Sequence, residues 1–130
     1  MSKTILHTQN APAAIGPYSQ AVCTLGALYT SGQLGIDPKT GELPSGVEAQ
    51  AEQSMKNLGA ILKEAGLDYA SIVKTTVFVT DLKNFATVNA VYQRFFDGDY
   101  PARSCVQVAA LPKGGLVEIE CIAVKGEAHV

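Results

Sequence analysis

An arginine and two glutamates near the end of the chain have the types and spacing needed to bind and protonate a small acid. Arg103 enters the stretch Pro101–Pro112, and Glu118 and Glu120 share one phase of the apolar run Val117–Val124. A planar guanidinium can hold a carboxylate through two parallel hydrogen bonds. The pattern therefore predicts that Arg103 holds a substrate carboxylate beside a glutamate that handles protons.

The same residues can also be interpreted as a structural ion pair. Two carboxylates in so apolar a strand are costly to bury without a partner, and Arg103 is the nearest candidate in sequence. Functional sites do gather unusual ionisable groups. The spacing alone leaves both interpretations open.

Cys105 lies two residues after Arg103 and invites an interpretation as a nucleophile. A nucleophilic cysteine needs a base, usually histidine, and the two histidines, His7 and His129, are isolated surface candidates. We therefore expect Cys105 to be a bystander thiol. The three cysteines of the chain are odd in number and lack metal-ligand spacing, which predicts free thiols in a reducing, cytoplasmic setting.

Length and charge limit the class of protein. The 130 residues suffice for one domain with one core, which we expect to span residues 1–130. A net charge of -2 gives no bulk attraction for phosphate backbones, and the lysines are scattered singly, so nucleic-acid binding is not expected. No apolar run approaches the length of a membrane span, which excludes membrane spanning.

The first part of the chain predicts three strands. They are expected at residues 4–8, 18–22 and 27–31, with a hairpin turn at Leu25 and Gly26. Tyr18 begins the second of these strands, after a loop rich in proline and glycine. Gly32 follows the third strand, where a missing side chain either lets a ligand or backbone approach or forms only a turn.

Two helices follow from apolar spacing. The first is expected over residues 45–65, with Ser45 and Glu48 as a capping box and Gly66 as its end. Asp81 or Asn84 is expected to cap the second. Its apolar stripe consists of Phe85, Val88, Tyr92, Phe95 and Phe96.

Strands at residues 72–80 and 117–124, and one within Pro101–Pro112 between its flanking prolines, complete the pattern. The order predicts an α+β fold with a single mixed sheet and both helices on one face. In the strand 72–80, Ile72 and Phe78 are opposite in phase to Val73, Val77 and Val79. Helices on one side leave the other apolar face uncovered, so we expect an oligomer to bury it.

Three blocks near the end of the chain resemble the signature of the Rid family, the reactive intermediate deaminases. They are Pro-Ala-Arg-Ser-Cys-Val from residue 101, Ala-Leu-Pro-Lys from residue 110 and Val-Glu-Ile-Glu from residue 117. Five further blocks resemble the family in the same order, namely Ala14–Ala21, Thr30–Gln33, Asp37–Glu42, Val73–Val77 and Phe85–Asn89. The resemblance covers about residues 3–125 and is closest to the RidA-type imine deaminases.

This resemblance implies a chorismate-mutase-like fold assembled as a homotrimer with ligand clefts between subunits. It implies hydrolysis of 2-iminopropanoate and 2-iminobutanoate to 2-keto acids and ammonia, without a metal or organic cofactor. The substrates would be enamine and imine products of pyridoxal-phosphate enzymes such as serine and threonine dehydratases.

The resemblance also implies a role for each matched residue. Arg103 would bind the carboxylate, Glu118 would orient water or transfer protons, and Cys105 would contribute mainly backbone groups. The other residues implied to line the cleft are Tyr18, Gly32 and Asn89. Asn89 falls toward the solvent side of its predicted helix, so it can also be interpreted as a surface amide.

Other functions in the family form the alternative. Some members are linked to RNA cleavage and translation inhibition, and others to ligand sensing or chaperone-like holding. This chain lacks the basic patch and aromatic platform that single-strand recognition uses. A sensor would need Arg103 but not Glu118, so the presence of both favours an enzyme. The sequence leaves open the preferred imine side chain and any physiological RNA or protein partner.

Overall fold

The computed structural model describes residues 2–126, and within them seven strands form one mixed sheet. The strands are β1 (Thr4–Leu6), β2 (Ala21–Thr24), β3 (Ala27–Thr30), β4 (Gln33–Leu34), β5 (Ile72–Val79), β6 (Ala102–Gln107) and β7 (Val117–Val124). Their order is β1-β2-β3-β7-β5-β6, and β4 also pairs with β7. Only β5 and β6 run parallel, whereas the other pairs are antiparallel.

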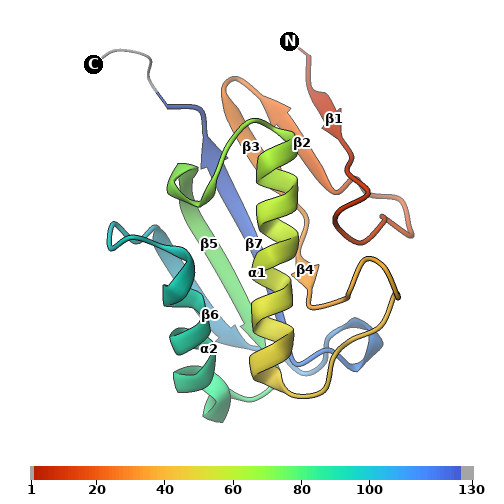
Figure 1. Ribbon diagram of the computed structural model, residues 1–130, viewed down its shortest axis with the longest axis vertical. Helices are drawn as coiled ribbons and strands as arrows, with labels where there is room; N and C mark the ends of the chain where they lie inside the picture. The colour runs from red at the N-terminus through yellow and green to blue at the C-terminus, as the bar shows by residue number, and fades with distance from the viewer. Residues whose placement is uncertain (1, 127–130) are drawn as a thin grey trace.

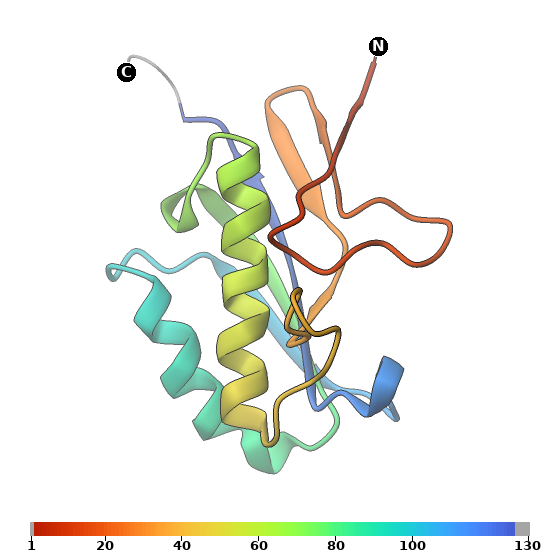
Figure 2. The same cartoon turned by 45° about the vertical axis from the view of Figure 1, so that its right-hand side comes forward.

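Both helices lie on the same face of this sheet (Figure 1). Helix α1 (Val47–Glu64) crosses the middle of the sheet, and α2 (Phe85–Tyr92) lies beside it, over β5 and β6. In the turned view of Figure 2, α1 lies in front of β5 and β7, with α2 beside it. The predicted α+β fold with two helices on one face is confirmed.

The core lies between α1, α2 and the sheet, where apolar side chains of both layers lose all contact with water. Fully buried members include Leu58, Ile61 and Leu62 of α1, Leu28 of β3, Val77 of β5 and Ile119 of β7. Burying such side chains contributes about 1.5–3 kcal/mol each. The apolar stripe that predicted the first helix is therefore the surface that attaches α1 to the sheet.

Turn chemistry sets several boundaries as predicted. Leu25 and Gly26 have φ of 51° and 78°, the two positive values that a tight hairpin turn requires. Gly66, with φ of 77°, ends α1. Its N–H donates to the carbonyl of Lys63, and the next N–H donates to the carbonyl of Leu62, which satisfies the last turn of the helix.

In the first half of the chain, one predicted helix cap and one predicted strand start were wrong. The capping box of Ser45 and Glu48 does not form, because Gly46, with φ of 90°, occupies the N-cap position and no side chain caps it. The second strand begins at Ala21 rather than Tyr18, since the backbone at Tyr18 turns back to bond to Gly16.

Caps around the second helix also differ from the prediction. The side chain of Asp81 accepts from the N–H of Lys83 and caps a short 3-10 turn, Leu82–Asn84. Asn84 stands at the N-cap of α2 without a side-chain hydrogen bond. Helix α2 itself stops at Tyr92, and a further 3-10 turn carries Gln93–Phe95.

The two-residue strand β4 had no signal in the sequence, and buried polar groups of α1 hold it in place. Ser54 Oγ donates to the carbonyl of Gln33 at 2.6 Å. Asn57 Nδ2 donates to the carbonyls of Leu34 at 3.0 Å and Ile36 at 2.9 Å. Gly35 allows this approach, because a Cβ there would collide with the backbone of α1.

The face of the sheet without helices carries a continuous row of paired residues. Residues that pair directly share a face, and Ile5, Val22, Tyr29 and Ile122 are paired in succession across four strands. Ile5 is 54% exposed and Tyr29 is 47% exposed. The predicted second apolar face is therefore present, on the side of the sheet that the helices leave uncovered.

The alternation behind that prediction was wrong at Ile72 and at Val73, which is 45% exposed although it was predicted to share a face with the buried Val77. A register shift between Ile72 and Lys74 of β5 places Ile72 opposite Ala123, on the helix side with Val77. Phe78 does project from the helix-free face, where it pairs with Glu118.

No helix within residues 2–126 is long and apolar enough to cross a membrane.

Asn57→Ala should lower the free energy of unfolding by about 2–4 kcal/mol, because the buried carbonyl of Leu34 and the half-buried carbonyl of Ile36 lose their donor. Gln53→Ala is the matched control, since the one hydrogen bond of the Gln53 side chain within residues 2–126 goes to the amide oxygen of Asn57. It should cost less than about 1 kcal/mol. Urea unfolding measures both, and equal losses in the two variants would contradict the anchoring role of Asn57.

Candidate active site

Arg103 lies on β6 and projects from the helix-covered face of the sheet. It pairs with Thr75 of β5, whose hydroxyl lies 2.6 Å from the hydroxyl of Tyr92 on α2. Arg103 Nη1 donates to Asn89 Oδ1 at 2.8 Å. The guanidinium carbon lies 4.9 Å from the ring centre of Tyr92 and 5.5 Å from that of Phe85. Two aromatic rings and one amide therefore fix the direction of the guanidinium.

Most of the hydrogen-bonding capacity of Arg103 is left for a ligand. A guanidinium has five N–H donors, and among residues 2–126 the one side-chain bond that it makes is to Asn89. No ion pair within that range involves Arg103. A carboxylate approaching the free edge of the group would find the fork geometry that binds it with two hydrogen bonds.

Asn89 is a partner of Arg103 rather than a surface amide. It stands four residues after Phe85 and three before Tyr92 on α2, and this spacing places the three side chains on one face of the helix. Phe85 and Tyr92 were predicted only as members of an apolar stripe. The apolar pattern did not predict that these two rings contact the guanidinium. Their spacing of four and three residues from Asn89 could have indicated it, because it places them on the face of the helix that carries Asn89.

Cys105 projects from the same face as Arg103, two residues further along β6, and it is half-buried against the core. Burial raises the pKa of the Cys105 thiol, and the charge of Arg103 opposes that rise. The thiol is therefore protonated at neutral pH, as expected for a bystander. We call Asn89, Arg103 and Cys105 the arginine half-site.

Glu118 lies on the other face of the sheet. It pairs with Phe78 of β5, whereas its neighbours Val117 and Ile119 are buried under the helices. The alternative interpretation of Arg103 and Glu118 as an ion pair within one chain is therefore wrong, because β5 lies between β6 and β7 and the two side chains project from opposite faces. Among the described residues, no ion pair involves Glu118 or Glu120.

Gly32 makes room for the carboxyl group of Glu118. A Cβ placed on Gly32 would lie 2.7 Å from Glu118 Cδ, closer than two carbon atoms pack. The close approach that the sequence suggested for Gly32 is real, and the group that approaches is a side chain of the same chain. Gly32 and Glu118 border a cavity of about 680 Å³ that Tyr18 also lines. We call Tyr18, Gly32 and Glu118 the glutamate half-site.

The cavity is mainly apolar, and three acidic residues, Asp37, Glu118 and Glu120, also line it. Its apolar lining includes Ile15, Leu34, Ile36 and Pro112, and Glu120 lies in it beside Glu118. Burial raises the pKa of Glu118, and the negative charge of Glu120 raises it further. Glu118 therefore holds a proton more readily than an ordinary glutamate.

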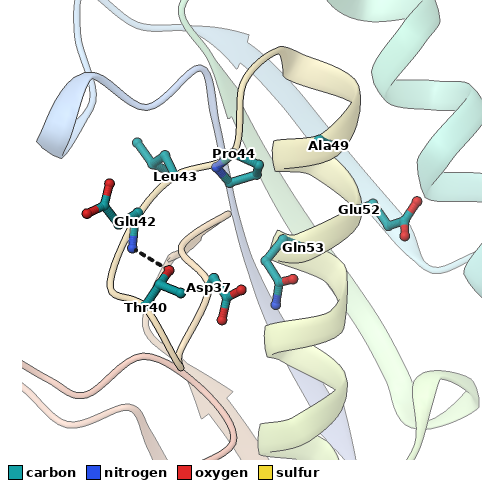
Figure 3. A pocket seen from close by; sticks show the side chains of 8 residues that line it. All are labelled: Asp37, Thr40, Glu42, Leu43, Pro44, Ala49, Glu52 and Gln53. Atoms are coloured by element: carbon teal, nitrogen blue, oxygen red, sulfur yellow. Dashed lines mark hydrogen bonds between the residues drawn. The ribbon is translucent and has the colours of Figure 1, made fainter.

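A second hollow of about 330 Å³ lies between the loop of residues 37–44 and α1 (Figure 3). Its lining includes Asp37, Glu42 and Glu52, and the N–H of Glu42 donates to Thr40 Oγ1 at 3.2 Å. None of the six predicted site residues lines it.

Within residues 2–126, no group of three or more histidine, cysteine, aspartate or glutamate side chains could hold a metal ion. His7 is exposed, and His129 lies outside the described residues.

Comparison with known proteins gives consistent results. A family model described as Endoribonuclease L-PSP matches residues 8–125. The chain is 59% identical over 128 residues to the 2-iminobutanoate/2-iminopropanoate deaminase of Escherichia coli K12, covering 96% of this chain and 99% of that protein. It is 55% identical over 125 residues to the protein of the same name from Bos taurus, covering 95% of this chain and 91% of that protein. The solved structure of E. coli TdcF with bound serine matches with a TM-score of 0.92 at 52% identity, covering 95% of this chain and 99% of that one.

The raised pKa of Cys105 predicts a slow and strongly pH-dependent alkylation, because the thiolate is the reactive form. Its rate with iodoacetamide should reach half-maximum at a higher pH than that of a free cysteine. Arg103→Ala should move this midpoint higher still, since the arginine charge favours the thiolate. Mass spectrometry of the labelled peptide against pH measures both, and a midpoint below that of free cysteine would contradict the assignment.

Proposed function

The chain belongs to the protein family described as Endoribonuclease L-PSP, and on that premise we propose that it hydrolyses 2-iminopropanoate and 2-iminobutanoate to 2-keto acids and ammonia. The resemblance to the Rid family is confirmed by relatives named for this reaction. The observation that carries the proposal is the guanidinium of Arg103, held by α2 with its remaining donors unpaired within residues 2–126.

The reaction makes few demands on the protein. The carbon of a protonated imine is already electrophilic, so the site must fix the carboxylate, position one water and move protons. Arg103 binds the carboxylate through its free N–H groups, and Asn89 keeps the guanidinium in place. Cys105 lies beside the ligand without reacting covalently, and Tyr18 and Gly32 line the cleft.

Glu118 handles the protons. As a carboxylate it accepts a proton from the water whose oxygen bonds to the imine carbon. In its protonated form it donates to the nitrogen. The C–N bond then breaks and ammonia leaves, while the hydroxyl oxygen forms the carbonyl and returns its proton to the Glu118 carboxylate, and ammonia or water takes that proton up. The pKa of Glu118, raised by burial and by Glu120, favours the protonated form that the second step needs.

A complete site requires two copies of the chain. Arg103 and Glu118 project from opposite faces of one sheet, so one subunit cannot bring both to one small ligand. Contact between the arginine half-site of one subunit and the glutamate half-site of the next is head-to-tail, and such contacts form a ring when the rotation between subunits closes. The uncovered apolar face gives the subunits a surface to bury. These features support an oligomer with its clefts between subunits, and the resemblance to the Rid family implies that it is a homotrimer.

The ligand of a relative supports the substrate class. E. coli TdcF binds serine, which carries a carboxylate and a nitrogen on neighbouring carbons, as 2-iminopropanoate does. Pyridoxal-phosphate dehydratases acting on serine and threonine release the enamines and imines that this protein would consume. A functional link to them and a cytoplasmic location remain predictions.

RNA cleavage is the second candidate, because the family description names an endoribonuclease. Charge argues against it. The large cavity presents Asp37, Glu118 and Glu120 against a single basic residue, Lys113, and this balance repels a phosphate backbone. Coupling a threonine dehydratase to the protein and following 2-oxobutanoate formation tests the deaminase. Incubation of the same preparation with single-stranded RNA tests the alternative.

Glu118→Gln should reduce turnover by about a hundredfold or more, because the amide keeps its size but loses proton transfer. Affinity for 2-oxobutanoate should change little. Glu120→Gln is the matched control and should retain most turnover. Because Glu120 raises the pKa of Glu118, its loss should move the alkaline decline of the rate to lower pH. Normal turnover in Glu118→Gln with a much lower melting temperature would instead make Glu118 structural.

Two inactive variants should complement each other if the site lies between subunits. Arg103→Lys keeps the charge but not the fork, so it should lose nearly all activity while staying folded. Jointly refolded with an equal amount of Glu118→Gln, it should recover up to about a quarter of wild-type activity, because random assembly leaves that share of interfaces intact. Separately refolded samples, mixed afterwards, are the control. No recovery in a mixture shown to contain both chains in one oligomer would place the site within a single chain.

A further inference from the structure

Gln20 directs its whole side chain into a loop that borders the large cavity. It is 2% exposed. Its Oε1 accepts from the N–H of Thr8 at 2.7 Å, and its Nε2 donates to the carbonyl of Thr8 at 3.0 Å. Nε2 also lies 2.8 Å from the carbonyl of Pro12 and 3.3 Å from that of Ala11. One amide group therefore fixes the path of residues 8–12.

The main chain at Ser19 and Gln20 binds a second segment that lines the cavity, at Ser31. The carbonyl of Gln20 accepts from the N–H of Ser31 at 2.9 Å, and Ser31 Oγ donates to the carbonyl of Ser19 at 2.6 Å. Ser31 precedes Gly32, whose missing side chain makes room for Glu118. Gln20 is thus bonded through its side chain to one segment and through its backbone to the other.

The segments joined in this way are the ones that line the cavity. Pro12, Ala13 and Tyr18 from the first segment line it, and so do Ser31 and Gly32 from the second. Gln20 does not line the cavity, and it touches no group to which the proposed reaction assigns chemistry. We infer that Gln20 is a positioning residue that sets the width of the substrate cleft, a role that rests on the proposed function.

Only an amide fits this position. Thr8 offers both an N–H and a carbonyl, so its partner must accept and donate at once, as a neighbouring strand would. In Gln20→Glu, a carboxylate of nearly the same shape would face three carbonyl oxygens without a proton to donate. The backbone bond to Ser31 does not involve the side chain and survives. The wall of residues 8–18 should therefore shift, whereas Gly32 and Glu118 stay in place.

Because residues 8–18 should shift while Glu118 stays in place, Gln20→Glu should change KM much more than kcat. Gln20→Glu should raise KM for 2-iminobutanoate by about tenfold or more, since a small displacement of binding groups is costly. It should leave kcat within about threefold of wild type, because Glu118 keeps its position. Both constants are measured from 2-oxobutanoate formation, well below the melting temperature and with the oligomeric state checked.

Tyr69→Phe is the matched control for a loss of stability alone. Tyr69 Oη donates to the carbonyl of Met55 at 2.7 Å, on a part of α1 that does not line the large cavity. This variant should melt at a lower temperature with KM unchanged. If Gln20→Glu behaves in the same way, or if kcat falls with KM unchanged, the positioning role is overturned while the deaminase stands. A wild-type protein without imine turnover overturns the proposed function, and the role of Gln20 with it.

Discussion

Residues that pair directly across a β-sheet project from the same face, and the register of β5 with its two neighbours decides from which faces Arg103 and Glu118 project. Through that register, Arg103 faces α2 beside Thr75, and Glu118 faces away from the helices beside Phe78. The helices, the cavity and the uncovered apolar face are all arranged around this division. Each half-site accordingly has its own physical environment.

The two environments suit opposite tasks. Arg103 keeps its charge in any surroundings, and the rings of Phe85 and Tyr92 stabilise that charge while Asn89 restricts its direction. Glu118 has no such partner among the described residues, and burial beside Glu120 favours its protonated form. A fixed cation and a readily protonated acid are what carboxylate binding and proton transfer require.

Local patterns predicted local structure well. The apolar stripe of the first helix, the turn at Leu25 and the end at Gly66 depend on neighbouring residues, and all three are found. The special status of Gly32 could also be anticipated, although the partner that fills its space could not. The site residues were identified through family motifs, and the structure brings them together as two groups rather than one.

Failures arose where the answer depends on distant parts of the chain. Strand β5 separates β6 from β7, so proximity in sequence wrongly suggested that Arg103 and Glu118 pair. The shift at Ile72 reverses a simple alternation, because an irregular pairing with β7 inserts one residue. Strand β4 has only two residues, too few for any periodicity, and exists because Ser54 and Asn57 of a distant helix bind its carbonyls.

The location of the half-sites on opposite faces has a consequence for how activity would arise during the life of the protein. A chain that has just folded carries every group needed for the proposed chemistry, yet it encloses no complete site. Catalytic activity would then appear only when subunits associate, and it would depend on protein concentration as association does. Synthesis rate and local abundance, rather than folding alone, would determine when the protein begins to work.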